Sequence, residues 1–264
     1  MEQVDVAGLR IAYERAGAGP PLVLLHGGIG DSRDWRRQLP AFAEEFDVVA
    51  WDAPGCGRSS DPPEHGYRLA DYADCLAGLI TQLELERPHV LGLSFGSGLA
   101  IELYRRHPGI PRSLILASAY AGWRGSLPRE EVEVRLQGAL RDSDRPPDEL
   151  VGEWLPSLRS ESTPPEAVDE MVEIMLEFHP VGVRTMARAF AEADLRDVLP
   201  SIEVPTLLIY GERDQRSPLH IAAELHDRIP NSELLVIPGA GHMSNYDDDA
   251  LFNDAVLTFL RRQH

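Results

Sequence analysis

Gly92-Leu93-Ser94-Phe95-Gly96 is the stretch from which the fold of this chain can be inferred. An apolar run ends at Leu93, and a helical pattern follows over residues 99–103. A serine on a sharp turn between a strand and a helix needs glycine two positions before and two positions after it. A Cβ atom at either position would collide across the turn. The stretch therefore predicts a strained turn that lifts the Ser94 hydroxyl above the end of a strand.

Short apolar runs recur on both sides of this turn, and longer amphipathic stretches separate them. The runs cover residues 22–25, 48–51, 90–93 and 114–117, and they resume at 205–210 and 233–237. Nearly continuous apolar runs are typical of strands that are buried on both faces. Their alternation with helical stretches predicts a mostly parallel sheet flanked by helices, with a final helix from about Asp249.

The strand pattern is interrupted between about residues 122 and 199. This segment has the pattern of several amphipathic helices, separated by breaks at Pro146-Pro147 and Pro164-Pro165. Because the strand pattern resumes afterwards, the helices interrupt one domain and do not follow it. We therefore expect residues 1–121 and 199–264 to form the core domain, and residues 122–198 to form a helical lid inserted in it.

A serine on such a turn becomes a nucleophile only when a base removes its proton, and a carboxylate must orient that base. Both partners follow predicted strands: Asp214 comes after the run at 205–210, and His242 comes after the run at 233–237. The order serine, acid, histidine is the one expected with this kind of turn. We predict Ser94, Asp214 and His242 as the catalytic residues, with Glu212 as the rival acid.

The sequence resembles the α/β-hydrolase family over nearly the whole chain outside the lid. Four blocks carry the resemblance: His26-Gly27-Gly28, then Asp52-Ala53-Pro54-Gly55-Cys56-Gly57-Arg58-Ser59, the turn at Ser94, and the paired loops at Asp214 and His242. The resemblance implies an α/β-hydrolase fold, in which a mostly parallel central sheet is flanked by helices and carries an inserted helical lid.

The resemblance also implies an oxyanion hole built from two backbone amides. Carried onto this chain, the amides belong to Gly28 and Phe95, with Ile29 replacing Gly28 if the loop is shifted by one residue. Amides of this kind each stabilise a transition state by about 3 to 4 kcal/mol. His26 is similar to the histidine that supports this loop in the family, and residues 52–59 have the composition of a structural loop.

The lid is expected to set substrate choice, but its pattern leaves the substrate open. Its large apolar residues are more typical of packing within the lid than of a pocket wall; they are Trp123, Trp154, Met171, Met175, Phe178, Met186 and Phe190. Arg184 and Arg188 lie one helical turn apart and could bind a substrate carboxylate, although a solvated helix face is their more ordinary role.

The resemblance favours cleavage of a small-molecule carboxylic ester or lactone through an acyl-enzyme. Hydrolysis of a carbon–carbon bond in a ring-cleavage product is the alternative, although enzymes with that activity usually have glycine where Ser97 stands. A ligand-binding protein of the same fold without turnover is a second alternative. Epoxide hydrolases and haloalkane dehalogenases have aspartate at the position of Ser94, so we expect neither of those activities.

Composition narrows the range of partners. The 264 residues carry a formal net charge of −18, which disfavours binding to nucleic acid or to an anionic membrane. Cys56 and Cys75 form no C-x-x-C motif, and the sequence shows neither a signal peptide nor an apolar run of about 18 residues. We expect a cytoplasmic protein, and the sequence does not determine its oligomeric state. In the absence of metal-binding and dinucleotide-binding motifs, we expect no metal and no cofactor.

Overall fold

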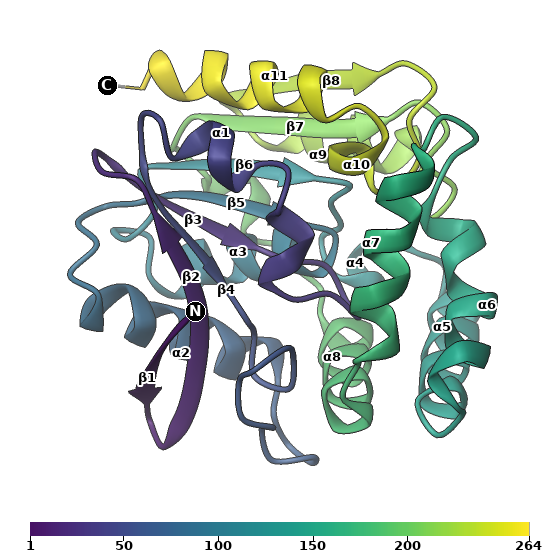
Figure 1. Ribbon diagram of the computed structural model, residues 1–264. Coiled ribbons are helices and arrows are strands. Elements are labelled where there is room, and N and C mark those ends of the chain that lie inside the picture. Colours follow the sequence, from purple (N-terminus) through teal and green to yellow (C-terminus); the bar gives the residue numbers. More distant parts are fainter. Residues whose placement is uncertain (264) are drawn as a thin grey trace.

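The apolar runs of the sequence form strands of one sheet in the computed structural model, which describes residues 1–263 (Figure 1). The strands are β1 (Glu2–Val6), β2 (Leu9–Ala16), β3 (Pro21–Leu25), β4 (Asp47–Trp51), β5 (His89–Leu93), β6 (Ser113–Ala117), β7 (Thr206–Gly211) and β8 (Ser232–Ile237). Their order across the sheet is β1-β2-β4-β3-β5-β6-β7-β8, and β3 to β8 run parallel. The predicted α/β class is confirmed.

Two strands at one edge of the sheet are not predicted from the sequence. β1 pairs antiparallel with β2, and β2 pairs antiparallel with β4. β1 lies at the edge, and most of its residues, including Glu2 and Asp5, are exposed or half-buried. An edge strand that faces water needs no continuous apolar run, so its sequence lacks the pattern by which the inner strands are recognised.

Helices cover both faces of the sheet. Alternate residues of a strand point to opposite faces, and in β3 Val23 and Leu25 enter one apolar cluster whereas Leu22 and Leu24 enter the other. The first cluster includes side chains of α2 (Leu69–Gln82), α3 (Phe95–Arg106) and α9 (Leu219–Arg228). The second includes side chains of α1 (Leu39–Phe42) and α11 (Asp249–Arg261). The expected final helix is thus present.

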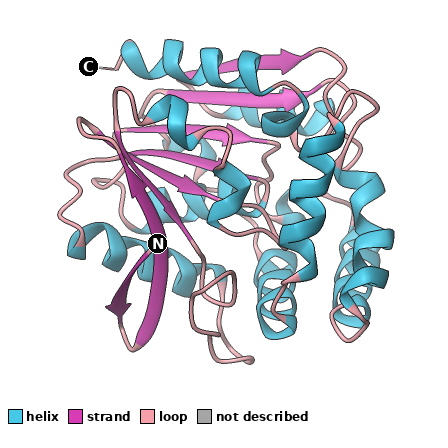
Figure 2. Ribbon diagram, in the orientation of Figure 1, coloured by secondary structure: helices cyan, strands magenta, loops and turns pink. Residues whose placement is uncertain are grey.

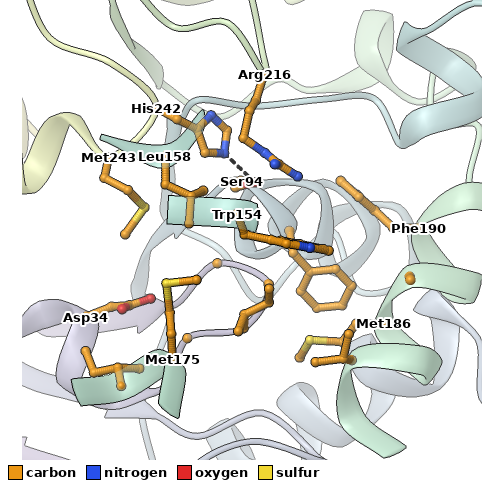
Figure 3. Close-up of a pocket in the computed structure, with 18 of the residues that line it drawn as sticks. Asp34, Ser94, Trp154, Leu158, Met175, Met186, Phe190, Arg216, His242 and Met243 are labelled. Carbon is orange, nitrogen blue, oxygen red and sulfur yellow. Dashed lines mark hydrogen bonds between the residues drawn. The ribbon is translucent and has the colours of Figure 1, made fainter. Parts of the chain in front are cut away.

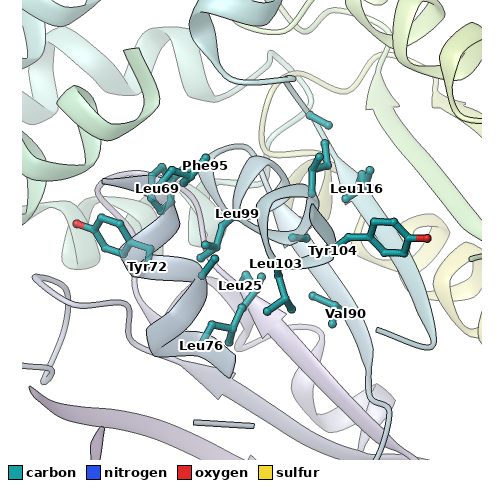
Figure 4. Close-up of a cluster of buried hydrophobic side chains, with 14 of the residues drawn as sticks. Leu25, Leu69, Tyr72, Leu76, Val90, Phe95, Leu99, Leu103, Tyr104 and Leu116 are labelled. Atoms are coloured by element: carbon teal, nitrogen blue, oxygen red, sulfur yellow. The ribbon is translucent and has the colours of Figure 1, made fainter. Parts of the chain in front are cut away.

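The helix after the serine turn is held firmly against the sheet. Leu99 and Leu103 of α3 lie among Leu25, Val90 and Leu76 in the first apolar cluster (Figure 4). Burial of one leucine side chain stabilises a fold by about 2 kcal/mol, so several of them fix the position of α3. The turn that precedes α3 is therefore carried on a rigid support.

Five helices come between β6 and β7 in the chain. They are α4 (Trp123–Ser126), α5 (Arg129–Asp142), α6 (Pro147–Leu158), α7 (Pro165–Leu176) and α8 (Pro180–Glu192). Proline occupies the first position of α6, α7 and α8, where its missing N–H has no partner to lose. Figure 2 shows α5 to α8 beside the ends of the strands toward which the arrowheads point.

The remaining elements are short. They are the 3-10 turns η1 (Ser32–Trp35) and η2 (Leu199–Ser201) and the helix α10 (Ser244–Asp247). No helix within residues 1–263 is both long enough and apolar enough to cross a bilayer.

Candidate active site

Ser94 sits on a strained turn between β5 and α3. Its backbone angles are φ 53° and ψ −109°, a conformation that non-glycine residues rarely adopt. A Cβ atom on Gly92 would lie 2.2 Å from the Gly96 carbonyl oxygen, and one on Gly96 would lie 2.2 Å from the Leu25 carbonyl oxygen. Both glycines are thus required by close backbone approach, which is the reason the sequence pattern indicated.

The structure brings the three predicted catalytic residues into one chain of hydrogen bonds. Ser94 Oγ lies 2.9 Å from His242 Nε2 (Figure 3). His242 Nδ1 lies 2.9 Å and 3.0 Å from the two Asp214 carboxylate oxygens. A proton on Nδ1 is donated to Asp214, which leaves Nε2 free to accept the Ser94 hydroxyl proton. The arrangement is suited to activating a serine.

Hydrogen bonds from the backbone hold the Asp214 carboxylate in place. The backbone N–H groups of Arg216 and Ser217 each donate to Asp214 Oδ1 at 2.9 Å. Burial alone would raise the pKa of Asp214, but His242 and the Ser217 N–H outweigh it, and the pKa lies below its usual value. Glu212, the rival acid, is exposed and accepts a hydrogen bond from the Gly239 backbone N–H at 2.9 Å.

Ser118, at the end of β6, supports the histidine loop and is not predicted from the sequence. Its hydroxyl donates to the His242 carbonyl oxygen at 2.7 Å. Its backbone φ of 47° is unusual for a non-glycine residue. A hydroxyl that acts through the backbone of another loop carries no recognisable signal in the sequence.

The two amides assigned to the oxyanion hole border the same cavity as Ser94. Gly28, Ile29 and Phe95 line it, and their backbone N–H groups have no hydrogen-bond acceptor among residues 1–263. His26 is buried: its Nδ1 donates to the Gly27 carbonyl oxygen at 2.7 Å and its Nε2 accepts from the Ala53 N–H at 3.0 Å. His26 therefore joins the two loops, as expected of a supporting residue.

The loop of residues 52–59 has a structural role in the fold. The buried Asp52 carboxylate accepts hydrogen bonds from the backbone N–H groups of Ser32 and Arg58, each at 2.8 Å. Cys56 is buried in contact with Met186, and burial raises the pKa of its thiol well above the usual value. The cysteine is consequently an inert packing residue.

The cavity above Ser94 is walled mainly by apolar side chains. We call Gly28, Ser94, Phe95 and His242, together with Asp214 behind His242, the cavity floor, because the turns and loops that follow the strands supply them. We call Trp154, Met171, Met175, Met186 and Phe190 the cavity roof, because the helices between β6 and β7 supply them.

Packing within the lid was the predicted role of these apolar residues, in preference to lining a pocket, and in the structure most of them do both. Of the seven named from the sequence, all except Phe178 line the cavity. Helical periodicity identifies a buried face but does not distinguish a packed face from one that borders a cavity.

Two charged residues that the sequence analysis did not single out also line the cavity: Arg216 from the loop after β7 and Asp34 from η1 (Figure 3). Asp34 is buried, and this burial raises the pKa of its carboxyl well above the usual value. Arg184, which the sequence analysis considered for binding a carboxylate, instead pairs with Glu64 at 2.7 Å and Asp144 at 3.1 Å. It does not line the cavity.

A mostly parallel sheet with this connectivity, together with a serine, a histidine and a carboxylate hydrogen-bonded in that order, defines a class of hydrolases. The chain belongs to the alpha/beta hydrolase family, whose model matches residues 22–255. The family resemblance inferred from the sequence is thereby confirmed.

Individual relatives agree with this membership. The chain is similar to a thermophilic esterase from Thermogutta terrifontis, solved with malate bound, with a TM-score of 0.93 and 30% identity over 100% of both chains. It is similar to a solved enzyme that degrades N-acyl homoserine lactones, with a TM-score of 0.84 and 28% identity, covering 98% of this chain and 100% of the other. It is also 31% identical to 2-hydroxymuconate semialdehyde hydrolase of Pseudomonas sp. strain CF600, covering 98% of this chain and 93% of that protein.

Proposed function

We propose that the protein hydrolyses a carboxylic ester or lactone through an acyl-enzyme formed on Ser94. The observation that carries the proposal is the hydrogen-bonded series Ser94, His242 and Asp214 on the floor of a mostly apolar cavity. The esterase and the lactone-degrading enzyme among its relatives support the choice of substrate class.

In the proposed first half-reaction, His242 Nε2 takes the proton of the Ser94 hydroxyl while Oγ attacks the substrate carbonyl carbon. The electron pair of the carbonyl moves onto its oxygen, which accepts hydrogen bonds from the Gly28 and Phe95 amides. When the tetrahedral intermediate collapses, the carbon–oxygen bond to the leaving group breaks, and the His242 proton passes to the departing alcohol oxygen.

The second half-reaction releases the acyl group by the same route. His242 removes a proton from water, the hydroxide oxygen attacks the acyl carbon, and the bond to Ser94 Oγ breaks as Oγ takes the proton back. Asp214 stays ionised throughout and stabilises the charged imidazole, without accepting its proton. The products are one carboxylic acid and one alcohol, or one hydroxy acid from a lactone.

The proposal includes the setting of this reaction. Residues 122–198 act as a lid that excludes water from the cavity and selects the substrate. Cys56 and Cys75 are both free thiols, which agrees with the reducing cytoplasm as the place of action.

The test is steady-state hydrolysis of a panel of short and medium acyl esters and lactones, with native protein and the Ser94→Ala variant. We expect turnover by the native protein and a loss of about 10⁴-fold or more in the variant. Circular dichroism and thermal unfolding show that the variant is folded.

The same experiment distinguishes the two alternatives. A folded protein that hydrolyses none of the panel but cleaves a ring-cleavage product would be a carbon–carbon bond hydrolase, the activity named for its Pseudomonas relative. A protein that binds panel members without cleaving any substrate would be a ligand-binding member of the fold.

A further inference from the structure

Arg216 presents a cation to the cavity beside the catalytic residues. It lies two residues after Asp214, lines the cavity, and points into it from the same side as His242 (Figure 3). Most other walls of the cavity are apolar. A guanidinium in such surroundings loses hydration and gains little in return unless a ligand supplies an acceptor.

The backbone of Arg216 is fixed at both of its polar groups. Its N–H donates to Asp214 Oδ1 at 2.9 Å. Its carbonyl oxygen accepts hydrogen bonds from Arg135 Nη2, at 2.9 Å, and from the Tyr120 hydroxyl. A side chain that starts from so constrained a backbone is pre-organised, and pre-organisation lowers the entropy lost when a ligand binds.

The Arg216 side chain is also held in place, but most of its N–H donors have no acceptor among the described residues. The guanidinium carbon lies 5.1 Å from the centre of the Trp154 ring, and Nη1 donates to Ser157 Oγ at 2.9 Å. Trp154 is itself fixed by donating from Nε1 to Asp142 at 3.0 Å. A guanidinium carries five N–H donors. Within residues 1–263 Arg216 makes no other side-chain hydrogen bond, and it makes no ion pair.

Asp214, the carboxylate nearest to Arg216 in sequence, cannot serve as the missing acceptor for its guanidinium. Both Asp214 oxygens are engaged by His242, and Oδ1 also receives the two backbone N–H groups of Arg216 and Ser217. Burial lowers the pKa of Arg216, with smaller effects of Tyr120, Arg135 and Asp214. The reduction agrees with a guanidinium that lacks a close counter-charge.

We propose that Arg216 binds a carboxylate carried by the substrate, so that the preferred substrates are esters or lactones that bear a separate, ionised carboxyl group. A carboxylate matches the planar fork of the guanidinium and can accept two parallel N–H bonds. The inference rests on the proposed ester or lactone hydrolysis and goes beyond it by naming a substrate class.

Two pairs of esters test the proposal, each differing in one carboxylate. Mono-4-nitrophenyl adipate and 4-nitrophenyl hexanoate differ in the acyl half, and 4-acetoxybenzoate and its methyl ester differ in the alcohol half. We expect the native protein to favour the anionic member of at least one pair. In Arg216→Met, kcat/KM should fall about 10- to 100-fold for that member and less than about threefold for its neutral partner. The pair that responds identifies the half that carries the carboxylate.

Further variants separate recognition from a structural role. Arg216→Lys keeps the charge and should recover part of the preference. Ser157→Ala removes one bond that positions the Arg216 side chain but keeps its charge, so it should lower the preference for the anionic ester less than Arg216→Met does. Arg188→Met, a change on α8 outside the cavity, is the matched control for loss of an arginine.

A binding measurement makes the inference independent of turnover. Calorimetric titration of Ser94→Ala with both esters of each pair should show tighter binding of the anionic member, and this difference should vanish in Ser94→Ala/Arg216→Met. If native protein hydrolyses no ester, the proposed function fails while this titration still tests Arg216. Equal effects of Arg216→Met on both members of both pairs, or equal binding of them, would overturn the inference.

Discussion

The floor and the roof of the cavity are built by different means. Short hydrogen bonds to or from the backbone hold the polar residues of the floor: two backbone N–H groups donate to Asp214, and the Ser118 hydroxyl donates to the His242 carbonyl oxygen. The roof consists largely of apolar side chains, among them the flexible Met171, Met175 and Met186. The comparison indicates that the floor fixes the chemistry within narrow limits, whereas the roof can change shape.

The polar contacts that attach the roof to the core are also weaker than the hydrogen bonds that hold the floor. α7 packs on the core through Ala167 and Met171 and is also tied to it by ion pairs, including the exposed pair of Arg36 with Glu173 at 3.1 Å and the partly buried pair of Arg37 with Glu170 at 3.0 Å. Exposed ion pairs typically contribute less than about 1 kcal/mol each. The floor should therefore respond strongly to small chemical changes, and the roof weakly.

The largest effect is expected in the floor, from Asp214→Asn. An amide cannot hold the imidazole in the required tautomer or stabilise its charged form, so kcat should fall about 10⁴-fold with little change in stability. Glu212→Gln, two residues away and exposed, is the matched control and should retain full activity. The comparison is made by ester hydrolysis and urea unfolding. Similar activity losses in both variants would refute the assignment of the acid.

Asp34 is the exception within the polar part of the cavity, because it is a buried acid without an ion pair among the described residues. Its folded-state pKa lies above that of the unfolded chain, so the unfolded chain loses its proton at lower pH. Ionisation thus costs the fold stability as pH rises from the ordinary carboxyl range toward the raised pKa.

Asp34→Asn should remove this cost. We expect the free energy of unfolding of the variant, measured with urea from pH 4 to pH 8, to exceed that of the native protein by about 1 to 3 kcal/mol at the upper end. The two should converge at the acidic end. A difference that is constant across the pH range would mean that Asp34 does not titrate as described.

In the roof, Met175→Ala should change selectivity and leave the chemical step intact. The truncated side chain withdraws apolar contact from a medium-length acyl chain, so kcat/KM for such an ester should fall about 10-fold. Hydrolysis of an acetyl ester should change less than about threefold. Leu176→Ala alters the next residue of α7, which is 43% exposed, and should change neither ester. An equal loss on both esters in Met175→Ala would show that the roof affects catalysis itself.

The smallest effect is expected from Glu170→Gln, which removes one ion pair between α7 and the core. We expect the free energy of unfolding to fall by less than about 1 kcal/mol at low salt and to be nearly unchanged in about 1 M salt, where surface charges are screened. Asp169→Asn, at an exposed position of the same helix, is the control. A loss of more than about 2 kcal/mol would indicate a roof attached as firmly as the floor.

The parts of the molecule that the sequence predicts well are those in which one local pattern has one physical cause. The apolar runs of β3 to β7 follow from burial on both faces, and the glycines around Ser94 follow from collisions within a single turn. The order of Ser94, Asp214 and His242 along the chain likewise identifies loops that a parallel sheet must bring to one edge.

The remaining features depend on distant contacts. Arg216 lies beside Trp154, which is 62 residues earlier in the chain, and no local pattern links an arginine after β7 to a tryptophan of α6. Arg184 shows the reverse case, since its helical spacing suggested a binding role and Glu64 from a distant loop neutralises it. Pairing between remote side chains decides whether a charge is available to a ligand.

The two glycines around Ser94 limit which mutations this turn can accept during evolution. A side chain at position 92 or 96 would meet backbone oxygen atoms, which cannot move aside, so selection must retain glycine at both positions whatever the enzyme does. The serine side chain plays no part in those collisions. Lineages descended from such a turn can therefore inherit its shape unchanged while exchanging the nucleophile at position 94, and form and chemistry can diverge by separate mutations.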